Sequence, residues 1–218
     1  MRTWGWPVCA AALVLAAAAR PAEAGDRVGI GVKFGTLGFG VDITGRISDL
    51  FSVRASFNGA NANDTHDESG IDYDTEVDFG ASGLLLDLHP FRNNFRLTAG
   101  WMKNRTGADL LAVPTENITI GDTVYTPAEA GTISGDISFK DSAGYVGFGY
   151  GSAARKPGRV RFLLDVGALL QGKAEATLTS SSGLVSPDDL AQEEQELEDD
   201  LDNLSFYPVV ALGISFRL

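Results

Sequence analysis

The sequence has few residues of the kinds that carry covalent or metal chemistry. Its 218 residues include one cysteine, Cys9, and two histidines, His66 and His89. A single cysteine excludes a disulfide within the chain, and neither the HExxH nor the CxxC spacing occurs. A glycine-rich phosphate-binding motif is also absent. We therefore expect no cofactor and no enzymatic activity, because His66 and the nearby acids of its loop do not by themselves indicate catalysis.

Positive charge and long apolar runs are scarce as well. The chain has 17 lysines and arginines against 29 acids, which gives a net charge of −12, and it contains no basic cluster. A nucleic-acid partner is therefore not expected. Beyond the first 24 residues there is no run of 18 apolar residues, so the sequence predicts no transmembrane helix.

The first 24 residues have the pattern of a secretory signal peptide. Arg2 lies near the start, an apolar stretch covers 8–19, and Ala-Glu-Ala at 22–24 forms a small-x-small cleavage site. The apolar stretch is shorter than the roughly 20 residues of a membrane-spanning helix. We predict cleavage before Gly25, which leaves residues 25–218 as one domain without cysteine.

Apolar residues alternate with polar or small ones in many segments of this domain. In FSVRASFNG, for example, Phe51, Val53 and Phe57 alternate with Ser52 and Arg54. Alternation of this kind is typical of strands with two unlike faces. We predict eight strands, over residues 27–35, 38–47, 51–60, 73–88, 95–105, 134–150, 159–178 and 205–218.

Two predicted strands have an irregular pattern. The alternation loses its phase at 84–86 in the fourth strand and at 141–142 in the sixth. A β-bulge at either place would restore the phase, because it adds one residue to one strand of a pair.

The connections between the predicted strands differ in length in a regular way. From the second strand onward, short turns alternate with the long stretches 61–72, 106–133 and 179–204. Outer-membrane barrels have short periplasmic turns and longer outer loops. A soluble β-sandwich also has many short strands, but its outward face is polar and its inner face bulky and apolar. Here the second face is rich in glycine, serine, alanine and threonine with scattered charges, which fits a narrow polar lumen.

The sequence thus predicts an all-β fold, an eight-stranded antiparallel transmembrane β-barrel. We expect it in the bacterial outer membrane with both termini in the periplasm, because the number of strands is even. Outer-membrane lipid and lipopolysaccharide would then surround the barrel.

Several segments resemble the small outer-membrane barrels of the OmpW-like kind. They are FGVDITGRISDLFSVRASFNG, LLLDLHPF, FRLTAGW, DSAGYVGFGYG and the closing YPVVALGISFRL, and they cover most of the predicted barrel. The resemblance implies an eight-stranded barrel linked to the passage of small hydrophobic compounds. The chain departs from that family in its first outer loop, which is only the tight turn GTLG, and in an acidic segment of its last loop.

The closing strand also resembles the signal that the outer-membrane assembly machinery reads. That signal ends on an aromatic residue with apolar residues at alternating positions before it. In this chain Phe216 and the terminal Leu218 occupy its end. The resemblance implies the barrel assembly machinery as a partner.

Nine charged residues form a predicted network on the inward face of the barrel strands. They are Lys33, Asp42, Arg46, Arg54, Arg96, Lys140, Arg161, Asp165 and Arg217. Buried charges need partners or water, so we expect these side chains to contact one another in the lumen. The network either gates a pore or fills a closed polar core, and the small interior of eight strands favours the closed core.

Two acidic segments lie in or beside the predicted outer loops. Asp72, Asp74, Glu76 and Asp78 share one strand face, where they either bind a divalent cation or form a solvated rim. Residues 187–203 predict a short acidic helix with a leucine stripe, preceded by a serine suited to N-capping. The stripe either caps the barrel mouth or contacts a partner.

The leading functional hypothesis is a small pore or passive conduit for small solutes, with hydrophobic solutes as the class that the resemblance implies. The alternative is a non-transporting structural or surface protein whose acidic outer loops bind ions or partners. A third hypothesis, a lipid-modifying barrel enzyme, would require His66 to join a catalytic group.

Overall fold

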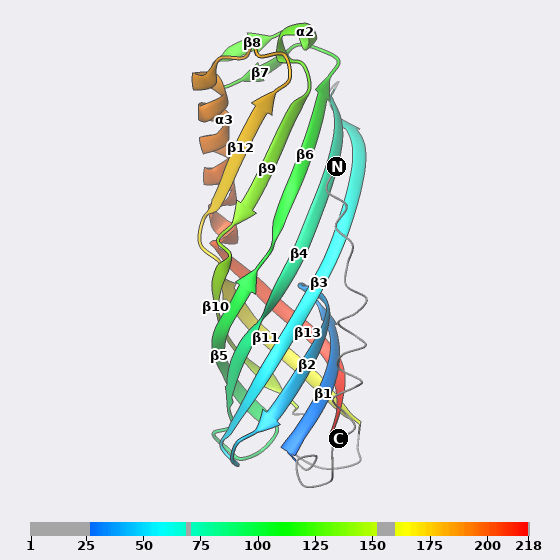
Figure 1. Cartoon of the computed structure of the whole chain (residues 1–218), viewed down its shortest axis with the longest axis vertical. Helices are drawn as coiled ribbons and strands as arrows, with labels where there is room; N and C mark the ends of the chain where they lie inside the picture. Colours follow the sequence, from blue (N-terminus) through cyan, green and yellow to red (C-terminus); the bar gives the residue numbers. More distant parts are fainter. Residues whose placement is uncertain (1–26, 69–70, 152–159, 218) are drawn as a thin grey trace.

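The computed structural model describes residues 27–68, 71–151 and 160–217, and within them eight strands close an antiparallel barrel (Figure 1). The barrel order is β1, β2, β3, β4, β5, β10, β11 and β13, and β13 pairs with β1. The bounds are β1 Val28–Gly35, β2 Gly38–Arg46, β3 Phe51–Glu68, β4 Ile71–Leu88, β5 Phe95–Asn104, β10 Ser142–Tyr150, β11 Arg161–Leu170 and β13 Phe206–Arg217. In this part of the chain no helix has the length and apolar composition of a membrane span. The predicted signal peptide and Leu218 lie outside the described residues.

The outer wall of the barrel is apolar and its interior is polar. Phe57, Leu84 and Phe148 point outward and are 51%, 60% and 49% exposed. Arg54 and Asp87, from the opposite faces of the same strands, are buried. A soluble barrel has the reverse arrangement, whereas a lipid-surrounded barrel has this one. The predicted eight-stranded transmembrane barrel is therefore confirmed.

Strands β3 and β4 continue far beyond the barrel. Residues Ala81–Leu88 of β4 pair with β5, and Ile71–Asp78 pair with β6 (Gly107–Pro114). β9 (Ile133–Phe139) and β12 (Ala174–Ser180) pair outward from β6 in turn. We call this layer, formed by the continuing parts of β3 and β4 with β6, β9 and β12, the extended sheet (Figure 1).

The prediction of a loop over 61–72 is wrong for most of that stretch. β3 and β4 pair in one unbroken register from Phe51 opposite Leu88 to Glu68 opposite Ile71. A constant register leaves no place for a β-bulge in β4, so the unclear phase at 84–86 has another cause.

Two predicted strands are each divided in the structure. The segment 134–150 forms β9 and β10, separated at Lys140 and Asp141, and the segment 159–178 forms β11 and β12. At both breaks the chain passes between the barrel wall and the extended sheet. The irregularity near 141–142 is therefore a strand end.

The far edge of the extended sheet carries the predicted acidic helix. α3 (Pro187–Asp200) begins at Ser186, whose side chain accepts a hydrogen bond of 3.2 Å from the Asp188 amide. The 3₁₀ turn η2 (Leu201–Ser205) joins α3 to β13. The strands β7 (Ile118–Ile120) and β8 (Thr123–Tyr125) and the one-turn helix α2 (Pro127–Ala130) lie at the tip, in a small apolar cluster with Leu190 of α3 packed against it.

The two ends of the barrel are different. At the turn end, short connections join β2 to β3 and β4 to β5. At the extended end, β1 and β2 are joined by the two-residue turn Thr36-Leu37, and Gly38 directly after it has a φ of 81° that suits glycine. Leu37 of this turn is 5% exposed and belongs to an apolar cluster with Leu85 and Met102.

Candidate functional site

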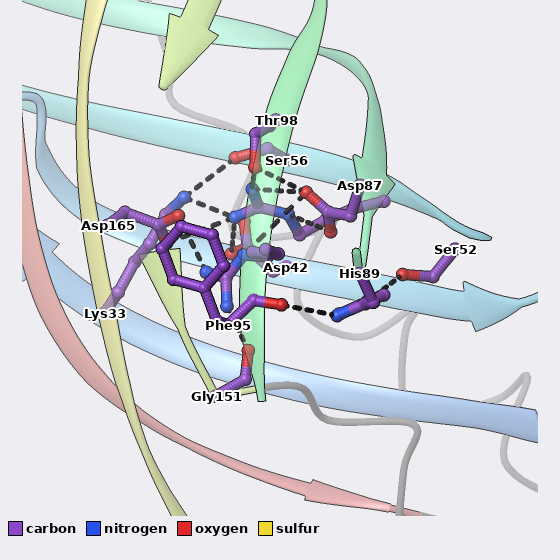
Figure 2. A network of polar contacts seen from close by, with 12 residues as sticks. Lys33, Asp42, Ser52, Ser56, Asp87, His89, Phe95, Thr98, Gly151 and Asp165 are labelled. Atoms are coloured by element: carbon purple, nitrogen blue, oxygen red, sulfur yellow. Dashed lines mark hydrogen bonds and ion pairs between the residues drawn. The ribbon is translucent and has the colours of Figure 1, made fainter. Parts of the chain in front are cut away.

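Arg54 is the centre of a buried ionic network in the barrel lumen. Figure 2 shows this network with its carboxylates Asp42, Asp87 and Asp165 labelled. Its Nη1 lies 3.0 Å from Asp42 Oδ2 of β2 and 3.2 Å from Asp165 Oδ2 of β11. Its Nε and Nη2 each donate to one oxygen of Asp87 on β4, both at 3.2 Å. One guanidinium thus contacts three carboxylates, including one bidentate pair, which is the geometry that arginine is suited to form.

Two further cations balance the charge of these carboxylates. Arg96 of β5 places Nη2 2.7 Å from Asp165 Oδ1 and donates through Nη1 to the Gly151 carbonyl. Lys33 of β1 places Nζ 2.9 Å from Asp42 Oδ1. Together with Arg54 they supply three positive charges for three carboxylates, with at most 8% exposure on any of the six side chains. Balanced pairing allows these charges to be buried.

The network crosses the full width of the barrel. Arg54 is on β3 and Asp165 is on β11, and these strands are four places apart in a ring of eight, so they lie on opposite walls. Their 3.2 Å contact therefore joins opposite sides of the lumen. The cavity beside Arg54 and Asp42 has a volume of about 10 Å³, which is room for about one water molecule.

A second layer fills the lumen nearer the extended end. Leu85, Met102 and Leu169 are each at most 3% exposed, and Tyr145 packs with them. Beyond this layer, Asn104 Nδ2 donates to Gln171 Oε1 at 3.1 Å. The described lumen therefore contains an ionic, an apolar and an amide layer in succession.

The predicted lumen residues divide into two groups. Lys33, Asp42, Arg54, Arg96 and Asp165 meet in the network, as expected. Lys140 is exposed between β9 and β10, beside Gly172. Arg46, Arg161 and Arg217 lie at the turn end and are not among the network's ion pairs.

Several residues in or beside the network were not predicted from the sequence. Asp87 accepts from Arg54 and, at 2.7 Å, from Thr98 Oγ1. His89 and Ser52 lie nearer the turn end, where the His89 Nε2 and Ser52 Oγ are 3.1 Å apart. The inward position of Asp87 follows from the β4 alternation once that strand is read without a bulge.

The predicted acidic rim lies on the outward face of the extended sheet. Asp74, Glu76 and Asp78 are exposed there, and the side chain of Asp72 lies outside the description. The backbones of alternate residues of one strand are roughly 7 Å apart. Within residues 27–68, 71–151 and 160–217, no three acidic, histidine or cysteine side chains are arranged to hold a metal.

The rim acids have acidic neighbours on adjacent strands. Glu76 lies opposite Asp109 of β6, which lies opposite Asp136 of β9. Partial burial and the nearby Asp136 and Asp78 carboxylates raise the pKa of Asp109. The outward face therefore carries a row of acids across three strands, beside the exposed Leu111 and Val113 of β6.

The acids of α3 bind the edge strand of the extended sheet. Glu194 Oε1 accepts from the Leu178 amide at 2.6 Å, and Glu198 Oε1 accepts from the Ala176 amide at 3.1 Å. These amides belong to β12, which ends the sheet. One turn of a helix is about as long as two residues of a strand. Glutamates four residues apart on α3 can therefore reach two amides that are two residues apart on β12 and point away from the sheet at its edge.

Comparison with known proteins identifies a shared fold. No protein-family model matches the chain, and no curated protein matches it. Two solved structures from Acinetobacter baumannii, CarO2 and CarO, are similar, each with 22% sequence identity over 88% of this chain and 98% of the other. The TM-scores are 0.59 and 0.58. At this identity the likeness concerns the barrel fold.

Proposed function

We propose that the protein is a bacterial outer-membrane protein with a closed lumen, whose function lies in the acidic extended sheet that the barrel carries. The observation that carries this proposal is the contact between Arg54 and Asp165 across the lumen. A cavity of about 10 Å³ beside it leaves no room for a solute larger than water. The barrel fold shared with CarO and the predicted signal peptide support the location.

The orientation belongs to the same proposal. Short turns of outer-membrane barrels face the periplasm, so the turn end and both termini would lie there. The extended sheet and α3 would then lie on the cell surface, beside lipopolysaccharide. Assembly would use the closing strand, in which the outward Phe216 is 40% exposed.

A conduit for small solutes is the second candidate function. The described groups that close the lumen are side chains, and side chains can rotate without unfolding the wall. The resemblance to OmpW-like barrels makes small hydrophobic compounds the solutes to test.

Conductance and solute uptake separate the two functions. Wild-type protein in planar bilayers and in vesicles should pass neither ions nor small apolar solutes. The double variant Arg54→Ala/Asp165→Ala removes the crossing contact without changing net charge, so it should conduct more than wild type. The matched control is Lys173→Ala/Asp202→Ala. It removes an exposed ion pair of 2.8 Å that lies outside the network, towards the extended sheet. Steady conductance or uptake by wild type would show that the closed-lumen proposal is wrong.

For the extended sheet we propose binding of cations or cationic partners at its acidic outward face, including divalent ions that bridge lipopolysaccharide phosphates. The support is the exposed row of Glu76, Asp109 and Asp136. The triple variant Asp74→Asn/Glu76→Gln/Asp78→Asn should weaken Ca²⁺ binding to the folded protein. Unchanged binding would remove the ion from this proposal.

A further inference from the structure

A pocket at the turn end of the barrel is lined by three arginines. Its volume is about 450 Å³, and Arg46, Arg92 and Arg161 line it together with two asparagines, Tyr150 and Asp49. None of these residues lines the small cavity beside Arg54. The volume lies within the roughly 300–1,000 Å³ range of ligand pockets.

The pocket is positive on a strongly negative protein. The described lining has three arginines and one carboxylate, Asp49, which contacts Arg46 through the Arg46 Nη2. This balance leaves an excess of two positive charges, whereas the whole chain has a net charge of −12. A concave surface of one sign attracts ligands of the opposite sign.

Arg161 offers a hydrogen-bond donor that the described structure does not use. Its Nη1 donates to Asn94 Oδ1 at 3.1 Å, which fixes the guanidinium at the pocket wall. Its Nε is buried and has no hydrogen-bond partner among the described residues. A buried donor without a partner is unfavourable, so this guanidinium is not fully satisfied by the described residues.

Arg92 occupies a backbone position that is unfavourable for arginine. Its φ is 49°, and among the described residues it is the one non-glycine residue with a positive φ. Glycine or asparagine adopts this conformation more readily. A strained position that holds a charged side chain at a pocket points to a role for that side chain.

Each pocket arginine is next in sequence to an exposed apolar residue. Ile47 follows Arg46, Phe91 precedes Arg92 and Val160 precedes Arg161; these apolar side chains are 60%, 70% and 70% exposed. Apolar and cationic side chains side by side at the end of a transmembrane barrel are expected where lipid meets water.

We propose that this pocket binds a phosphate group, with Arg46, Arg92 and Arg161 as its donors. Guanidinium groups match phosphate oxygens in charge and geometry. The phosphate belongs either to the headgroup of an anionic lipid or to a soluble phosphate-bearing molecule. The inference does not depend on whether the lumen conducts.

The test uses the folded full chain in a nonionic detergent. One arm measures retention of phosphatidylglycerol by native mass spectrometry, with diacylglycerol of the same acyl chains as the lipid without phosphate. The other arm measures inorganic phosphate by equilibrium dialysis. Arg92→Gln and Arg161→Gln should each weaken binding at least about tenfold, since each removes a charged hydrogen bond. Arg105→Gln, which removes an exposed arginine from the other end, should bind like wild type.

Two further controls keep the outcome clear. Arg161→Lys keeps the charge but loses the planar fork, so its binding should lie between wild type and Arg161→Gln. Arg92 is exposed in a turn, so its variant tests binding without disturbing the barrel wall. Binding of phosphatidylglycerol alone identifies a lipid headgroup, and binding of inorganic phosphate identifies a soluble source. Absence of binding in both arms, equal retention of diacylglycerol, or unchanged binding by Arg92→Gln and Arg161→Gln would overturn the proposal.

Discussion

Strand β4 has opposite surface chemistry in its two halves. In the barrel half, the outward Leu84 is apolar and the inward Asp87 is charged. In the extended sheet, the outward Glu76 is acidic, whereas the inward Val77 lies in an apolar row with its neighbours on β6 and β9. The register of β4 with β3 does not change between the halves.

The difference shows what the alternation of apolar and polar residues can predict. It separates the two faces of a strand, but it does not show whether a face meets lipid, water or the protein interior. In the barrel, lipid surrounds the outer face, and the lumen holds the charges. Beyond the barrel, the outer face carries exposed acids, and the inward face is apolar as in an ordinary sheet. The change occurs near Gly80, between the acidic and the apolar outward residues.

Loss of Arg54 should destabilise the barrel half most. Arg54→Ala leaves Asp42, Asp87 and Asp165 buried together without their main cation, which costs about 3–5 kcal/mol for a broken buried pair. Urea unfolding of the protein in lipid vesicles measures the free energy. Arg105→Ala, an exposed control, should change it little, and equal losses for the two variants would contradict the role of the network.

A lysine placed at either of two outward positions of β4, one in the barrel and one in the extended sheet, tests whether the surroundings of the strand change from lipid to water. Leu84→Lys places a charge in lipid and should cost about 2–4 kcal/mol of folding free energy. Glu76→Lys, on the same outward face of the same strand, should cost nothing or stabilise, because it relieves repulsion with Asp109. Vesicle unfolding compares the two, and similar losses would place Glu76 in the same medium as Leu84.

The glutamates of α3 should protect the edge of the extended sheet and leave the barrel unchanged. Glu194→Ala removes the acceptor of the Leu178 amide and should cost about 0.5–1.5 kcal/mol locally. Hydrogen exchange at Leu178 should quicken while exchange in β5 stays slow. Glu196→Ala is the control, since Glu196 bonds only to Gln192 of its own helix in the described structure. Equal exchange rates at Leu178 in Glu194→Ala and Glu196→Ala would show that Glu194 does not protect the edge of the extended sheet.

Asp109 should give the smallest effect, and it should depend on pH. Because its pKa is raised in the folded state, the folded protein binds this proton more tightly than the unfolded chain does. The repulsion, about 0.2–1 kcal/mol for opposed like charges, is therefore present above the raised pKa and is lost as the pH falls through it. Asp109→Asn should stabilise at pH 7 and have little effect near pH 3. Melting temperatures at the two values measure this, and a gain independent of pH would contradict it.

The barrel strands could be predicted because lipid requires an unbroken apolar face. The continuation of β3 could not, since Asn61, Asn63 and Asp64 are polar whichever face they occupy. In β4 the three successive leucines at 84–86 concealed the phase, because the inward Leu85 belongs to the apolar layer of the lumen. That uncertainty also hid Asp87.

The sequence predicted many of the residues of the candidate site but not which of them contact one another. Alternation placed Arg54 and Asp165 in the lumen, but their meeting across the barrel depends on strand order, which alternation does not give. The arginine pocket has no sequence signal, because its arginines come from three separate places in the chain: Arg46 ends β2, Arg92 lies between β4 and β5, and Arg161 begins β11. The acids of α3 were predicted as part of a short acidic helix, but nothing in their spacing identified β12 as their partner.

The pairing of α3 with β12 has a consequence for many copies in one membrane. Proteins in a bilayer diffuse in a plane with a common orientation, so the edge strands of all copies travel at the same height. An open β12 would meet another open β12 at each lateral encounter, and unpaired edges of this kind join into larger sheets. Two glutamates of α3 already occupy the amides of Ala176 and Leu178, so these amides are not open to the edge strand of a neighbouring copy.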